Sequence, residues 1–101
     1  MISLLKNLFK NDDVDHREAI EKGAVIIDVR TPGEFRDGHL DKAVNIPLSE
    51  ITSQVEMIRK WNKPVITVCR SGARSGIAKN ILEQSGIKAT NGGAWNHFKL
   101  K

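Results

Sequence analysis

Residues 64–75 read PVITVCRSGARS, a stretch that joins a strand signal to a chemically reactive side chain. The β-branched run before Cys69 predicts a buried strand, and the glycine and small residues after it predict a loop that opens a helix. A thiol at that junction faces converging backbone N–H groups and a helix N-terminus, which favour negative charge. Because the thiolate is the nucleophilic form of cysteine, Cys69 is predicted to be reactive.

The loop after the cysteine contains residues suited to an anion. Gly72 permits a tight curl of the backbone. Arg70 and Arg74 add positive charge, which is expected to lower the thiol pKa and to attract a dianionic substrate. Ser71 and Ser75 supply hydroxyl hydrogen bonds. The alternative is a buried, inert thiol, a common state of cysteine, and the basic, glycine-containing flank argues against it.

Two other cysteine chemistries have weaker support in the sequence. A cysteine protease needs a histidine base, but none of the chain's histidines, His16, His39 and His97, has a context that marks it as one. A single cysteine with scattered histidines also lacks paired metal-ligand spacing. We therefore expect neither a metal site nor a cofactor.

Composition limits the remaining classes. The chain has 101 residues, of which 40% are hydrophobic and 28% charged, as in one ordinary globular domain. Its formal net charge of +4 is spread along the sequence with few aromatic residues, so nucleic-acid binding is not expected. Its single cysteine forms no intrachain disulfide, and a free thiol fits a reducing compartment such as the cytoplasm.

The chain is expected to divide into an N-terminal segment, residues 1–14, and a domain, residues 15–101. The segment begins MISLLKNLFK, whose apolar residues can share one side of a short helix packed on the domain. The apolar stretch is too short to span a membrane, and no stable membrane association is expected.

Strand and helix signals alternate along the domain, which predicts a small α/β fold with a largely parallel sheet and helices on both faces. Sites in such sheets form at the carboxyl ends of strands, where Cys69 is placed. Strands are expected at 24–29, 43–46, 64–69 and 88–91. Helices are expected from the cap at Asp15 to Gly23, as a short turn at 34–37, from a cap at Ser49 or Thr52 to Asn62, at 75–84, and after a turn at Gly92-Gly93, where Trp95 and Phe98 are expected to anchor the core.

Three motifs in order resemble the single-domain rhodanese family of sulfurtransferases. The first is DVRTPGEF at 28–35 with GHL at 38–40 and AVNIP at 43–47, the second is VCRSGARS at 68–75, and the third is NGG at 91–93 with Trp95. Several ordered motifs are more specific than any single one. One departure is Asp41-Lys42, which stands where the family often has a small residue or glycine before the alanine.

The resemblance implies that Cys69 takes a sulfane sulfur from a small anionic donor such as thiosulfate, becomes a persulfide, and passes the sulfur to a thiol or protein acceptor. It implies that the backbone of residues 70–75, Arg70, Ser71, Gly72, Ala73, Arg74 and Ser75, forms the anion cradle. Four other residues match the first motif and are expected to pin the loops as ion pairs and scaffold, not as catalysts: Asp28, Arg30, Glu34 and His39.

Two alternatives stay open beside this enzyme. Cdc25-type phosphatases and arsenate reductases resemble the fold but place five residues between cysteine and arginine, whereas four separate Cys69 from Arg74. A shorter ring of N–H groups suits a sulfur centre better than a phosphate. The other alternative is a sulfur carrier or protein-interaction module without turnover, whose sequence would look the same.

Overall fold

The structure is a computed structural model that describes residues 16–98. Among them, four strands form one sheet in the order β2-β1-β3-β4, and every neighbouring pair is parallel. The strands are β1 (Val25–Asp28), β2 (Val44–Asn45), β3 (Val65–Cys69) and β4 (Ala89–Ala94). β1 and β3 occupy the middle, which explains their apolar sequences, because central parallel strands are covered on both faces.

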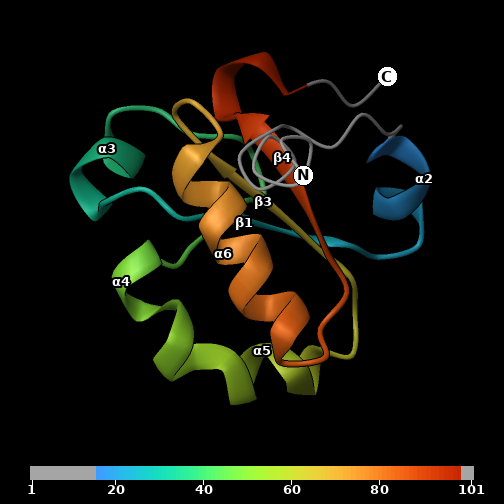
Figure 1. Cartoon of the computed structure of the whole chain (residues 1–101). Helices are drawn as coiled ribbons and strands as arrows, with labels where there is room; N and C mark the ends of the chain where they lie inside the picture. Colours follow the sequence, from blue (N-terminus) through green and yellow to red (C-terminus); the bar gives the residue numbers. More distant parts are fainter. Residues whose placement is uncertain (1–15, 99–101) are drawn as a thin grey trace, which may run out of the picture.

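Helices cover both faces of this sheet, which confirms the expected α/β architecture (Figure 1). α4, α5 and α6 supply one face, while α2 and the last turn η2 supply the other. No helix within residues 16–98 is long and apolar enough to cross a membrane. The helical elements are α2 (His16–Glu21), α3 (Pro32–Arg36), α4 (Leu48–Ile51), η1 (Thr52–Gln54), α5 (Val55–Trp61), α6 (Ala73–Gln84) and η2 (Trp95–His97).

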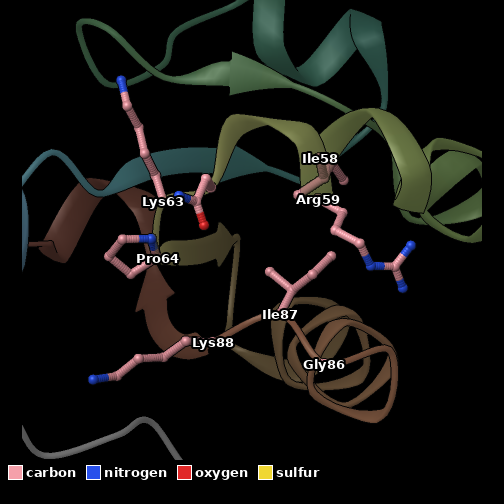
Figure 2. Close-up of a pocket in the computed structure, with 8 residues that line it drawn as sticks. Ile58, Arg59, Lys63, Pro64, Gly86, Ile87 and Lys88 are labelled. Carbon is pink, nitrogen blue, oxygen red and sulfur yellow. The ribbon is translucent and has the colours of Figure 1, made fainter.

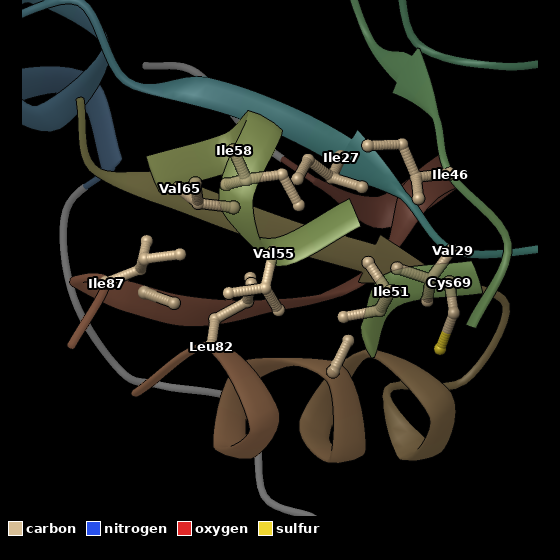
Figure 3. Close-up of a cluster of buried hydrophobic side chains, with 12 residues drawn as sticks. Ile27, Val29, Ile46, Ile51, Val55, Ile58, Val65, Cys69, Leu82 and Ile87 are labelled. Atoms are coloured by element: carbon tan, nitrogen blue, oxygen red, sulfur yellow. The ribbon is translucent and has the colours of Figure 1, made fainter. Parts of the chain in front are cut away.

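Alternate residues of the central strands belong to two hydrophobic core clusters, one on each face of the sheet. Ile27, Val65 and Cys69 point into the cluster beneath α4, α5 and α6, where the sulfur lies near the start of α6 (Figure 3). Ile26, Ile66 and Val68 point the other way. Trp95 and Phe98 pack on that second cluster, so their expected role as core anchors is confirmed.

The prediction of a single helix from Ser49 or Thr52 to Asn62 is wrong. The structure has α4, the 3-10 turn η1 and α5 in this region. The Ser53 hydroxyl donates to the carbonyl of Glu50 at 2.9 Å, a local bond that competes with regular helix geometry. Neither expected cap is used, since α4 begins after Pro47 without a side-chain cap. Asn62 does end α5, with a left-handed φ of 54°.

The turn expected at Gly92-Gly93 is also wrong, because β4 continues through both glycines to Ala94. The strand pairing shifts between Thr67 and Val68, so Gly92 is the extra residue of a β-bulge. A Cβ on Gly92 would lie 2.9 Å from Ile66 Cγ2, which explains the glycine. The helix expected after it is only the 3-10 turn η2.

Smaller differences affect the ends of elements. α6 starts at Ala73, two residues earlier than expected, and Ile77 is 41% exposed, so it lies outside the core face of that helix. Lys42 has a φ of 70°, the left-handed conformation that a glycine would adopt more readily. The N-terminal segment and the expected cap at Asp15 lie outside the described residues.

Candidate active site

Cys69 ends β3 at the carboxyl edge of the sheet, and its side chain is fully buried. The backbone N–H of Gly72 donates to Cys69 Sγ at 3.0 Å, and the N–H of Ser75 donates at 3.4 Å. The Ser75 hydroxyl lies 3.3 Å from the same sulfur. The loop therefore surrounds the sulfur on the side of Gly72 and Ser75.

The N-terminus of α6 provides these donors. Gly72 is the N-cap, and its φ of 98° is left-handed, which turns the chain sharply from the strand into the helix. The first N–H groups of a helix have no partner within it, and the helix dipole places partial positive charge there. In this chain the N–H groups of Gly72 and Ser75 point at the sulfur of Cys69, and the role of the loop as an anion cradle stays a prediction.

The cradle favours the ionised form of the sulfur. Burial alone would raise the pKa of the Cys69 thiol, but hydrogen bonds from Ser75, Gly72 and Ser71 outweigh it, and the pKa lies below the usual value of 9.0. A lowered pKa increases the thiolate fraction at neutral pH. Most of this effect comes from the loop's backbone and one hydroxyl, not from its arginines.

A polar network behind the cysteine fixes the loop. The Ser75 hydroxyl donates to Asn91 Oδ1 at 2.6 Å, and Asn91 Nδ2 donates to the Gly72 carbonyl at 3.0 Å. Thr67 Oγ1 donates to the Ser75 carbonyl at 2.8 Å. Thr67, Ser75 and Asn91 are at most 1% exposed. β3 and β4 thus hold both ends of the loop.

Arg74 contacts a carboxylate rather than an open anion site. Its guanidinium donates to both oxygens of Glu34, at 2.9 and 3.0 Å. Arg74 and the Thr31 N–H hold the pKa of Glu34 down at about 2, and Glu34 in turn raises the pKa of Arg74. The charge of Cys69 also raises the pKa of Arg74, but by less than the charge of Glu34 does. The pair ties α3 to the cysteine loop.

A second ion pair, between Asp28 and Arg30, lies at the carboxyl end of β1. Arg30 Nε and Nη2 donate to the carboxylate of Asp28 at 2.9 and 2.7 Å, and both side chains are at least 95% buried. Arg30 Nη2 also donates to the Gly38 carbonyl at 2.8 Å, and its guanidinium lies 4.6 Å from the centre of the Trp95 ring. Asp28 and Arg30 thus form a buried pair after β1, and their role as scaffold rather than catalysts stays a prediction.

His39 likewise holds local structure. Its Nδ1 is 2.7 Å from the Phe35 carbonyl, and its ring stacks on that of Phe35 at 3.7 Å between centroids. Within residues 16–98, no three His, Cys, Asp or Glu side chains gather as metal ligands would.

A cavity of about 310 Å³ lies beside the cysteine loop. Arg30 and Glu34 line it, but both are already engaged in the ion pairs above. Arg70 is exposed and forms no ion pair with the described residues, so its charge is open to an anionic ligand. The lining residues are Arg30, Glu34, Asp37, Arg70, Trp95 and Asn96.

Another hollow, of about 300 Å³, lies at the opposite end of the sheet, before β3 and β4 begin. Ile58 and Ile87 line it together with Arg59, Lys63 and Lys88. Figure 2 shows the side chains of Lys63 and Lys88 extending away from one another. Since Cys69 is at the far end of β3, this hollow has no part in the cysteine site.

Thr67 and Asn91, which complete the site from the strands, were not among the predicted site residues. The sequence signal for Asn91 was its place in the NGG motif at 91–93, one of the three motifs that carry the resemblance. Asn45 was also not among the predicted site residues; its Nδ2 donates to the carbonyls of Asp28 and Arg30 at 3.0 Å each and fixes the end of β1.

Fold and site together define an α/β domain that holds one cysteine, its sulfur hydrogen-bonded by loop N–H groups, at the carboxyl edge of a parallel sheet. A family model, the Rhodanese-like domain, matches residues 12–97, and the chain belongs to this family.

Relatives with similar sequences include proteins named as sulfurtransferases. A putative mitochondrial thiosulfate sulfurtransferase of Schizosaccharomyces pombe is 31% identical over 103 residues, covering 88% of this chain and 72% of that protein. Thiosulfate sulfurtransferase PspE of Escherichia coli is 38% identical over 61 residues, 59% of each chain. The uncharacterised YqhL of Bacillus subtilis is 44% identical over 63 residues, 62% of this chain, and this match spans about half of that protein's length, 49%.

Solved structures show the same fold. A rhodanese-related protein of Thermoplasma volcanium superposes with a TM-score of 0.72 at 27% identity, covering 86% of this chain and 93% of that one. An E. coli rhodanese with anions gives a TM-score of 0.69 at 31% identity, covering 78% and 95%. The expected resemblance to single-domain rhodaneses is therefore confirmed.

Proposed function

We propose that this protein is a sulfurtransferase that carries a sulfane sulfur on Cys69 between a small anionic donor and a thiol or protein acceptor. The single observation that carries the proposal is the sulfur of Cys69 hydrogen-bonded by loop N–H groups at the start of α6. The relatives named as thiosulfate sulfurtransferases support thiosulfate as the donor. The reaction uses no cofactor, because the nucleophile is a protein side chain.

In the first step, the Cys69 thiolate attacks the outer sulfur of thiosulfate. A new S–S bond forms to Cys69, the S–S bond of thiosulfate breaks, and sulfite leaves with the electron pair. The N–H groups of the loop stabilise negative charge on the sulfur throughout, as an oxyanion hole does for oxygen. The backbone of residues 70–75 is the proposed cradle.

In the second step, a nucleophilic acceptor such as cyanide or a thiolate attacks the outer sulfur of the persulfide. The bond to Cys69 breaks, and its electron pair restores the thiolate. Since the chain has one cysteine, no second thiol of the same chain resolves the persulfide as a disulfide. The acceptor is therefore an outside molecule.

Arg70 is the proposed binding residue for the sulfonate end of the donor. It lines the cavity beside the loop and is exposed, whereas Arg74 is committed to Glu34. An exposed charge contact of this kind contributes up to about 1 kcal/mol, so Arg70→Ala should raise KM for thiosulfate about two- to fivefold. Lys63→Ala, which removes an exposed cation at the other end of the sheet, is the matched control and should leave KM unchanged.

Mass spectrometry tests the proposal directly. The reduced protein is incubated with thiosulfate and weighed intact, and it should gain the mass of one sulfur atom and lose it again on addition of cyanide. Cys69→Ala should gain nothing. The absence of a gain, or an equal gain in Cys69→Ala, would contradict persulfide formation at this residue.

Turnover separates the enzyme from a carrier. An enzyme forms thiocyanate repeatedly from thiosulfate and cyanide, whereas a carrier is loaded once and then retains a partner protein.

Because a free reactive thiol persists in reducing surroundings, we also propose a cytoplasmic location.

A further inference from the structure

Asn91 lies behind the reactive sulfur at the end of a short chain of hydrogen bonds. Cys69 Sγ is 3.3 Å from Ser75 Oγ, and Ser75 Oγ is 2.6 Å from Asn91 Oδ1. Asn91 Oδ1 also accepts from the Gly93 N–H at 3.0 Å, while Nδ2 donates to the Gly72 carbonyl at 3.0 Å.

These two backbone partners determine which way the Asn91 amide faces. A flipped amide would place its NH₂ group against the Gly93 N–H and its oxygen against the Gly72 carbonyl, and both contacts would be repulsive. The atom facing Ser75 is therefore the amide oxygen, which carries no hydrogen. Ser75 has to be the donor in the 2.6 Å bond.

A serine hydroxyl has a single hydrogen, so while it donates to Asn91 it can offer only a lone pair to the sulfur. In that arrangement the Cys69 S–H donates to Ser75, and the neutral thiol is stabilised. The N–H groups of Gly72 and Ser75 act in the opposite sense, because they stabilise the thiolate. The Ser75 hydroxyl thus favours the protonated sulfur, whereas the two N–H groups favour the ionised sulfur.

Rotation of the hydroxyl resolves this competition. When the sulfur is ionised, the Ser75 O–H can turn to donate to it, and Asn91 Oδ1 still accepts from the Gly93 N–H. The rotation therefore leaves no buried oxygen without a donor, which would be costly. The only proton that leaves is the thiol's own, which goes to solvent, and Ser75 keeps its hydrogen.

We propose that Asn91 is a positioning residue: it directs the Ser75 hydroxyl away from Cys69 while the sulfur is a thiol, and releases it to donate when the sulfur is anionic. The inference concerns the proton on Cys69 and deepens the proposed function, which requires the thiolate. In this mechanism Asn91 acts on the sulfur through the Ser75 hydroxyl.

The charged groups around the cysteine do not account for the effect proposed for Asn91 and Ser75. Arg74 on α6 is paired with Glu34 on α3, and Arg30 is paired with Asp28 on β1. β4 carries no charged side chain. None of these groups is altered by the variants below, so their effect on the thiol pKa is the same in each protein.

Infrared spectroscopy of the S–H stretch gives the first test, because the chain's single cysteine produces a single band. In the reduced protein below the thiol pKa, the band should lie at the lowered frequency of a hydrogen-bonded S–H. In Ser75→Ala it should move up to the frequency of an unbonded thiol. An unbonded band in the wild-type protein would overturn the proposal.

A double-mutant cycle on the thiol pKa gives the second test. The pKa is read from the pH dependence of alkylation or of thiolate absorbance. Asn91→Ala frees the Ser75 hydrogen for the sulfur, so the pKa should fall by about half a unit to one unit, the worth of one hydrogen bond. In a Ser75→Ala background, the same change should lower it no further. Thr90→Ala, which alters the neighbouring residue of β4, is the control.

The cycle separates the proposed role from a structural one. Asn91 also holds the Gly72 carbonyl, and loss of that bond acts equally in both backgrounds. Equal shifts in the two backgrounds would show that Asn91 works through the loop alone and would overturn the proposal. If Asn91→Ala does not fold, an unbonded S–H band in the wild-type protein would still overturn the proposal. Neither test requires sulfur transfer, so failure of the proposed activity is seen separately, in the mass and turnover assays.

Discussion

Replacing Glu34 with glutamine tests whether the Glu34–Arg74 pair stabilises the fold through its charge. Glu34 accepts two hydrogen bonds from Arg74 and one at 3.0 Å from the Thr31 N–H. Its pKa is about 2 instead of 4.5, owing first to the bond from Arg74. Glutamine keeps the shape and one acceptor oxygen but removes the charge.

The lowered pKa sets an upper bound on the size of the effect. The full lowering corresponds to about 3 kcal/mol at 1.36 kcal/mol per pKa unit. The two side chains are 31% and 35% exposed, and water screens such a pair. We therefore expect Glu34→Gln to lower the free energy of unfolding by about 1 kcal/mol at neutral pH, and the Tm by about 4–8 °C.

The sign of the pH dependence follows from the direction of the pKa change. A carboxylate with a lower pKa in the folded protein stabilises it fully above the unfolded value of 4.5, and the contribution is lost as the pH falls toward about 2. The wild-type protein should thus lose its advantage over Glu34→Gln across this window. Glu56, whose pKa is also lowered, is present in both proteins and cancels.

Urea unfolding of both proteins at several pH values between 7 and about 2, followed by tryptophan fluorescence, measures this difference. The measured quantity is the difference in free energy of unfolding at each pH, with Glu21→Gln as a control for loss of one exposed carboxylate. A difference that stays constant from neutral pH down to about 2 would refute the charge-based explanation.

Three further substitutions test the scaffold, each measured by urea unfolding. Gly92→Ala places a Cβ 2.9 Å from Ile66 Cγ2 and should cost about 1–3 kcal/mol; no loss would mean that the bulge is not closely packed. Asp28→Asn leaves the buried Arg30 charge uncompensated and should cost about 3–5 kcal/mol, whereas a loss under about 1 kcal/mol would contradict this. Lys42→Gly relieves a φ of 70° and should stabilise by about 0.5–1 kcal/mol, and a decrease in stability would refute that strain.

The fold was predictable because its central strands carry strong local signals. The run at 24–29 and the run before Cys69 are apolar and β-branched, which only a doubly covered strand explains. The bulge at Gly92 was not predictable in the same way. Its glycines look like turn residues in sequence, and only the side chains of Ile66, Val68 and Phe98 on other segments show why a Cβ is excluded there.

The site was predictable in its nucleophile and less so in its electrostatics. Cys69 and the curl at Gly72 are neighbours in sequence, so local reasoning reaches them. The partner of Arg74 is 40 residues away along the chain, and Asn91 is 16 residues from Ser75. Such pairs depend on how the strands meet at one edge of the sheet, which sequence periodicity does not specify.

The two loop arginines consequently have different roles, although the sequence presents them alike. Arg74 is paired with the carboxylate of Glu34, which cancels most of its electrostatic effect on other groups. Its main effect is to join α3 to the loop. Arg70 is exposed beside the cavity, where a charge acts on an approaching anion. The lowering of the thiol pKa comes instead from the Ser75 hydroxyl and from the N–H groups of Ser75, Gly72 and Ser71. Salt should therefore weaken donor binding through Arg70 but leave the Cys69 pKa nearly unchanged, because backbone dipoles at van der Waals distance are not screened.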